Sequence, residues 1–208
     1  MATVAEIAFD AHKILATLYS KQSPMLKPYL FFILLMFGIQ SHRYAASAIY
    51  GTNNGFVTFH SDAPLELITA SSKQLRGKLD IDKKLFAFTV LVTSFSGFNN
   101  PLQKEHFNEN YLESSLFPSA SFSGRIIEDI DFNVEGNYSI RAKGNFIIHG
   151  VAQERIIKGD IVISKGTISI KSDFTILLSD HNIAIPKIVH EKLASEIKIT
   201  VKADLVQL

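Results

Sequence analysis

The stretch Glu196–Leu205 reads EIKITVKADL, and its apolar and polar residues alternate without a break. Successive side chains of a β-strand point to opposite faces, so this period of two indicates a strand with one buried and one exposed face. The buried face would carry Ile197, Ile199, Val201, Ala203 and Leu205. The chain is therefore predicted to end in a half-buried strand.

Six further runs alternate in the same way or are rich in β-branched and aromatic residues. They are Gly55–Ser61, Leu85–Phe95, Ser121–Ile127, Tyr138–His149, Arg155–Ser164 and Thr167–Leu178. Turn signals precede or separate several of them, at Asn53-Asn54-Gly55, Gly136-Asn137 and Lys165-Gly166. About eight regularly spaced strands indicate one all-β domain, either a sandwich or an up-and-down barrel.

Two stretches lack the strand period and are predicted to be short helices that cap this β body. Leu102–Ser115 has mixed polarity, and Pro186–Ser195 begins with a proline, which suits the first position of a helix. No linker rich in Pro, Gly or Ser divides the region between them.

The composition narrows the function classes. The chain has 208 residues and no Cys, so disulfides, thiolate metal sites and Cys nucleophiles are excluded. Its 21 Lys and Arg against 20 Asp and Glu leave a formal charge of +1. A nucleic-acid-binding domain usually has a clear basic excess, so we expect no nucleic-acid partner.

The N-terminal part resembles an export signal. Tyr29–Ile39 is an uncharged, mostly apolar run that would span about 16 Å as a helix, against about 30 Å for the hydrocarbon core of a bilayer. Lys27 precedes it, and Ala46-Ser47-Ala48 follows it as a cleavage pattern. We predict an upstream extension over residues 1–24, a signal peptide over 25–48 and a mature domain over 49–208 that is periplasmic or secreted. The alternative is that Met1–Ser20 forms a genuine amphipathic helix of the protein.

Phenylalanine is abundant, with 16 copies and no Trp. Five of them fall in five different predicted strands: Phe59, Phe88, Phe122, Phe146 and Phe174. The interior of an eight-stranded barrel is either filled by side chains or holds one small ligand. Periodicity alone favours the filled core.

Three segments resemble the YceI-like domain, a lipocalin-like family of polyisoprenoid-binding proteins. The first is Val92–Phe122, which contains Phe117-Pro118-Ser119-Ala120-Ser121-Phe122. The second is Gly144–Val151, GNFIIHGV, and the third runs from Phe174 through Asp180 and Ile183-Ala184-Ile185-Pro186 into the last strand. The stretch Glu105–Tyr111 is similar to a branch common in Bacteroidetes-type bacteria. The resemblance covers about Gly55–Leu205.

The resemblance implies an antiparallel eight-stranded lipocalin-like barrel with short capping helices and an elongated apolar cavity. It implies a binding protein rather than an enzyme, with a long isoprenoid lipid such as a quinone or polyprenyl chain as its ligand and no other cofactor. Transport, storage and stress protection are the roles it suggests. The expected cavity wall consists of Phe59, Phe88, Val90, Phe122, Phe146, Ile148, Phe174 and Ile176, with Phe107 and Tyr111 near the mouth.

The alternative is a metal-dependent or acid–base enzyme on the same barrel. Glu105, His106, Glu109 and Glu113 have helical spacing that could present a carboxylate–imidazole metal site, although a solvated helix face has the same pattern. His149 is expected to be structural. No nucleophile elbow, zinc-protease motif or phosphate-binding glycine loop is present. A free edge on the last strand would support a homodimer, which nothing in the sequence requires.

Overall fold

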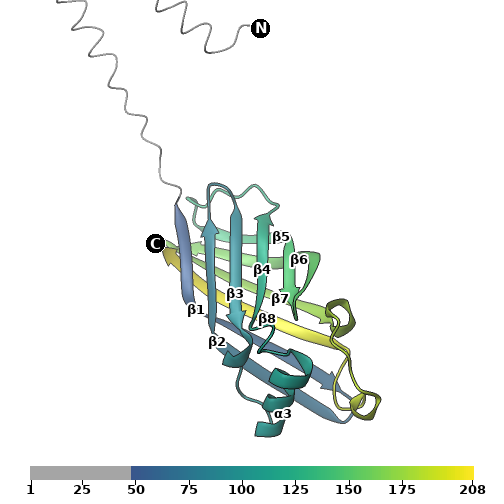
Figure 1. Cartoon of the computed structure of the whole chain (residues 1–208). Helices are drawn as coiled ribbons and strands as arrows, with labels where there is room; N and C mark the ends of the chain where they lie inside the picture. The colour runs from purple at the N-terminus through teal and green to yellow at the C-terminus, as the bar shows by residue number, and fades with distance from the viewer. Residues whose placement is uncertain (1–47) are drawn as a thin grey trace, which may run out of the picture. The chain divides into compact units, whose positions relative to one another are not determined.

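The computed structural model describes residues 48–208, and the predicted extension and nearly all of the predicted signal peptide lie outside them. Eight antiparallel strands form a closed barrel in chain order (Figure 1). Their bounds are β1 (Ile49–Ala63), β2 (Glu66–Asp80), β3 (Leu85–Leu91), β4 (Ser119–Ile126), β5 (Gly136–Ile148), β6 (Val151–Ser164), β7 (Thr167–Leu177) and β8 (Glu196–Gln207). The barrel prediction is confirmed, and the sandwich is excluded.

The alternation correctly identified which side chains face inward. On β8, Ile197, Ala203 and Leu205 are buried, whereas the intervening Lys and Asp residues are exposed. The strand pairs with β7 on one side and with β1 on the other, so it has no free edge of the kind proposed above for a homodimer. The Lys165-Gly166 turn is also confirmed, because both residues have positive φ and join β6 to β7.

The strand β2 escaped detection in the sequence because its alternation changes phase. Its buried residues are Ala70 and Ser72 before Lys73-Gln74, and Leu75, Gly77 and Leu79 after it. An irregularity in the facing strand accompanies this change. Asn53-Asn54-Gly55, predicted to be a turn, lies inside β1 at a register shift, so the turn prediction was wrong.

A glycine pair lets β4 and β5 approach closely. Gly124 and Gly144 face each other in the ladder. A Cβ on Gly124 would lie 2.1 Å from the carbonyl oxygen of Lys143, a distance that no side chain tolerates. Side chains are therefore excluded at this crossing, which draws the two strands together.

The predicted helix at Leu102–Ser115 is present as the helix α3 (Pro101–His106) followed by a π-helical turn, η2 (Phe107–Tyr111). The Asn100 side chain caps α3 by accepting a hydrogen bond from the Gln103 N–H at 2.9 Å. In Figure 1, α3 lies at the end of the barrel opposite the C-terminus, and we call this the cap end.

The second predicted helix, Pro186–Ser195, is only a 3₁₀ turn, η4 (Lys187–Val189), followed by further turns. Backbone groups of this stretch form hydrogen bonds with β1 and with the turn between β1 and β2 instead of continuing a helix. The Glu191 carbonyl accepts from the Leu65 N–H, and the Ala194 N–H donates to the Ser61 hydroxyl at 2.9 Å. Two more 3₁₀ turns lie within residues 48–208, η1 (Val92–Ser94) and η3 (Leu178–His181).

Candidate ligand-binding site

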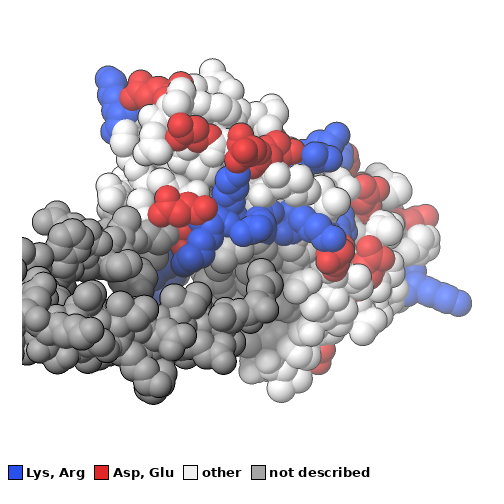
Figure 2. Space-filling model, turned by 90° about the horizontal axis from the view of Figure 1, so that it is seen from above, with Lys and Arg blue, Asp and Glu red and all other residues white. Residues whose placement is uncertain are grey.

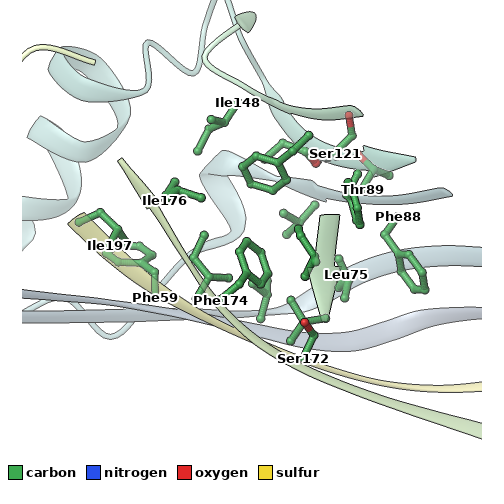
Figure 3. Close-up of a pocket in the computed structure, with 18 of the residues that line it drawn as sticks. Phe59, Leu75, Phe88, Thr89, Ser121, Ile148, Ser172, Phe174, Ile176 and Ile197 are labelled. Atoms are coloured by element: carbon green, nitrogen blue, oxygen red, sulfur yellow. Dashed lines mark hydrogen bonds between the residues drawn. The ribbon is translucent and has the colours of Figure 1, made fainter. Parts of the chain in front are cut away.

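An apolar cavity of about 220 Å³ lies inside the barrel. All eight strands contribute to its wall, and Phe107, Tyr111, Leu112, Leu178 and Leu193 line it at the cap end. Figure 3 shows Phe59, Phe174 and Ile176 gathered around one space, with Phe88 at the other end of the group of labelled residues. At the opposite end of the barrel, Leu79, Ile161 and Leu205 are fully buried and close it.

The structure places all ten sequence-predicted site residues in this wall. They are Phe59, Phe88, Val90, Phe107, Tyr111, Phe122, Phe146, Ile148, Phe174 and Ile176. The positions of the eight strand residues follow from the alternation, because inward residues of a strand are two apart, whereas Phe107 and Tyr111 come from η2. Contact between these residues and a ligand stays a prediction.

Sequence reasoning missed wall residues of two kinds. Leu75 and Leu79 belong to β2, whose alternation is interrupted, so only the apolar spacing of its second half signalled them. Ile140 and Ile157 were open to the same period-two argument that selected Phe146.

Aromatic rings run along the wall. The ring centroids of Phe86 and Phe122 are 4.9 Å apart, those of Phe122 and Phe146 are 6.3 Å apart, and those of Phe146 and Phe174 are 5.8 Å apart. These distances are in the range of favourable ring pairs, and the rings come from β3, β4, β5 and β7. The wall therefore offers large, rigid contact area to an apolar ligand.

The cap is attached to the barrel by a second aromatic cluster. Phe107 of η2 stacks on Phe59 with centroids 5.3 Å apart, and its ring also contacts Phe95 and Phe98. One turn further along, Tyr111 lines the cavity, and burial raises the pKa of its phenol. The phenol stays protonated at neutral pH and can donate a hydrogen bond at the cap end of the cavity.

The metal alternative is not supported by the geometry. Within residues 48–208, no group of three His, Asp or Glu side chains is placed to hold a metal ion. The helical spacing of the four predicted ligands is lost, because α3 gives way to a π-helical turn and Glu113 lies beyond it with a positive φ of 44°. Glu113 instead accepts a hydrogen bond from His149 at 2.6 Å.

His149 occupies the turn between β5 and β6 and is held on both sides. Its Nε2 faces the Glu113 carboxylate, and its Nδ1 lies 3.1 Å from the carbonyl oxygen of His181. Phe117 packs edge-on against the ring. These contacts fix the cap segment to the β5–β6 turn, in agreement with the structural role expected from the sequence.

His181 is fully buried beside this turn, and its Nδ1 donates to the carbonyl of Val151 at 3.1 Å. Its Nε2 has no hydrogen-bond partner among the described residues, and Phe146 packs edge-on against the ring. Burial, more than any nearby charge, lowers the pKa of His181. The neutral ring fits this site, and a protonated ring would place an unpaired N–H in it.

Charges on the outer surface are mixed. On the face shown in Figure 2, Lys and Arg side chains lie next to Asp and Glu side chains. The ion pairs Arg141–Glu128 and Lys143–Glu154 are examples of such neighbours. Among the helices formed by residues 48–208, none has the length and apolar character needed to cross a membrane.

The chain is similar in fold to solved structures of low sequence identity. A polyisoprenoid binding domain from Saccharophagus degradans, described as implicated in plant cell wall breakdown, aligns with a TM-score of 0.66 and 12% identity over 78% of this chain and 100% of that one. BcnA from Burkholderia cenocepacia aligns with a TM-score of 0.60 and 16% identity over 73% and 96% of the two chains. The comparison with curated proteins gave no significant match. The model of the YceI-like domain matches residues 47–205, and the chain therefore belongs to the YceI-like domain family.

Proposed function

We propose that this chain is an exported binding protein that holds the tail of an isoprenoid lipid, such as a quinone or polyprenyl chain, inside its barrel. The observation that carries the proposal is the cavity with an aromatic and aliphatic wall. An isoprenoid tail has no hydrogen-bond donors, so it needs apolar area and shape rather than charge. Each CH₂ that leaves water contributes about 0.8 kcal/mol.

Membership of the YceI-like family supports a binding role, and the Saccharophagus degradans relative carries the description of a polyisoprenoid binding domain. Binding then requires no catalytic group, in accord with the structural contacts of His149. Transport, storage or protection of the lipid in the periplasm or outside the cell is the role we propose.

The size of the cavity leads to a specific expectation about tail length. Its volume of about 220 Å³ is below the roughly 300–1,000 Å³ of pockets that enclose drug-sized ligands. We infer that the cavity takes a few isoprene units, that wall side chains rotate to admit more, and that the polar head stays outside.

A titration with isoprenoid alcohols tests this proposal. Geraniol, farnesol and geranylgeraniol share a hydroxyl head and differ only in the number of isoprene units. We expect the dissociation constant to fall steeply with each added unit until the cavity is full. An affinity that does not depend on tail length, or no binding of any of the three, would contradict the proposal.

The export part of the proposal has its own test. We expect the mature chain to begin at Ile49, after the Ala46-Ser47-Ala48 pattern. N-terminal sequencing of protein recovered from outside the cytoplasm checks this, and a chain that still begins near Met1 would contradict export.

A further inference from the structure

The hydrogen-bonded pairing of strands β6 and β7 ends about halfway along the two strands. Their ladder runs only from Ser164–Thr167 to Asp160–Lys171. Beyond it, both strands continue for several residues, β6 paired with β5 and β7 paired with β8, but not with each other. A gap in the backbone ladder therefore opens between residues 151–159 of β6 and residues 172–177 of β7.

The gap is a window with a backbone frame on every side. The Asp160–Lys171 pair forms its base, and the turn η3 crosses from β7 to β6 at its top, where the His181 ring donates to the Val151 carbonyl. The cavity reaches the base of this window, because Lys158, Gly159 and Ser172 belong to the cavity wall. Ser172 is labelled in the close-up of the cavity (Figure 3).

Among residues 48–208, side chains rather than backbone pairs close the window. Ser172 donates to the Lys158 carbonyl at 2.6 Å, Arg155 donates to the Thr175 carbonyl at 2.8 Å, and Gln153 donates to the Asp180 carbonyl at 2.7 Å. Arg155 reaches across the middle, and its other terminal nitrogen lies 3.9 Å from the Asp180 carboxylate. Its side chain is 29% exposed, so water can replace its partners when it swings out.

Packed apolar side chains close two other routes into the cavity. At one end, three fully buried aliphatic side chains fill the barrel. At the cap end, η2 is attached through Phe107, whose ring packs against Phe59, Phe95 and Phe98. Opening the cap exposes these rings to water, whereas opening the window exchanges a few side-chain hydrogen bonds for bonds to water.

We propose that the window between β6 and β7 is the route by which the lipid enters and leaves the cavity, and that Arg155 is its latch. An apolar tail passes sideways between the two strands once Arg155 and Ser172 release the opposite carbonyls. This proposal rests on the proposed lipid-binding function. It differs from entry through an end of the barrel, which leaves the β6–β7 gap closed.

An engineered disulfide tests the route directly. An ideal Cβ on Gly159 would lie 3.4 Å from the Cβ of Ser172, close to the 3.5–4.5 Å that disulfides span. Since the chain has no Cys, the double variant Gly159→Cys/Ser172→Cys would contain a single thiol pair, which oxidation locks and dithiothreitol releases. The matched control, Ser169→Cys/Asp204→Cys, joins partners in the intact β7–β8 ladder.

The readout is the exchange of bound geranylgeraniol for its deuterated form, followed by native mass spectrometry of the full chain. We expect oxidation to slow exchange about tenfold or more in the window variant, with recovery on reduction, and to leave the control unchanged. Equal exchange rates in the oxidised and reduced window variant would overturn the proposal.

A second variant keeps the test independent of disulfide formation. Arg155→Ala removes the latch and should speed exchange, whereas Arg141→Ala, which removes an arginine paired with Glu128 on the outer face of β5, should not. Equal rates in these two variants would also overturn the proposal. If geranylgeraniol does not bind the unsubstituted chain at all, the lipid-binding function itself is wrong, and the proposed route fails with it.

Discussion

Filling the cavity from within should weaken lipid binding without unfolding the barrel. Ala142 lies on β5 and lines the cavity wall, and Ala142→Phe would place a phenyl ring of about the size of one isoprene unit in the space. An isoprene unit has five carbons, so at about 0.8 kcal/mol per carbon its displacement removes up to about 4 kcal/mol of binding free energy. That corresponds to a loss of affinity of up to about 1,000-fold.

The assay is a calorimetric titration with geranylgeraniol, together with urea unfolding of the lipid-free protein. Ala87→Phe is the matched control, because Ala87 lies on the exposed outer face of β3. We expect this control to keep the affinity within roughly twofold of the unsubstituted chain. The free energy of unfolding of Ala142→Phe should fall by less than about 1–3 kcal/mol, the usual cost of overpacking. If both variants bind equally well, the tail does not occupy this cavity.

Three further substitutions test the cap and its histidines. Phe107→Ala removes the ring that attaches the cap, so it should lower the free energy of unfolding in urea by about 2–4 kcal/mol. The control Leu102→Ala changes an exposed residue of the same segment and should cost under about 0.5 kcal/mol. Similar losses in the two variants would contradict the attachment of the cap through Phe107. Burial holds the pKa of His181 below its ordinary value of about 6.5, so the folded state binds fewer protons than the unfolded state. The contribution of neutral His181 to stability is therefore complete above about pH 6.5 and is lost as the pH falls below that value. The free energy of unfolding of His181→Gln should consequently depend less on pH between about pH 7 and pH 5 than that of the unsubstituted chain. In His149→Asn, the new asparagine tolerates the φ of 52° at that position. The substitution should lower the free energy of unfolding by about 1–3 kcal/mol, because Glu113 loses its partner, and should leave geranylgeraniol affinity within about twofold. Loss of binding would overturn the structural role of His149.

Alternation revealed most of the barrel because each strand has one buried face and one exposed face. The signal was strongest on β8, where no polar residue falls on the inward side between Ile197 and Leu205. It failed on β2, where the inward side holds Ala70 and Ser72 and then changes phase at Lys73-Gln74. Small or polar buried residues and a bulge remove the contrast on which the period depends.

Most of the wall of the candidate site was predictable for the same reason. The alternation shows which side chains of a strand are buried, and in a barrel of eight strands the buried face is the one that lines the interior. The window was not predictable, because it depends on where the β6–β7 ladder stops. The inward residues next to the last pair, Gly159 and Ser172, do not by themselves end a ladder. Polar residues at inward positions, Gln153 and Arg155 on β6 and Ser172 on β7, were the available signal. Their partners come from segments that only the fold brings close.

The residues that a bound tail contacts decide whether the barrel interior is the binding site. Nuclear Overhauser effects between the methyl groups of geranylgeraniol and the side chains of the full chain report which residues the tail touches. We expect contacts with Phe59, Phe146 and Ile176 inside the barrel. Contacts confined to exposed apolar residues such as Leu65 and Leu67, with none to the cavity wall, would contradict it.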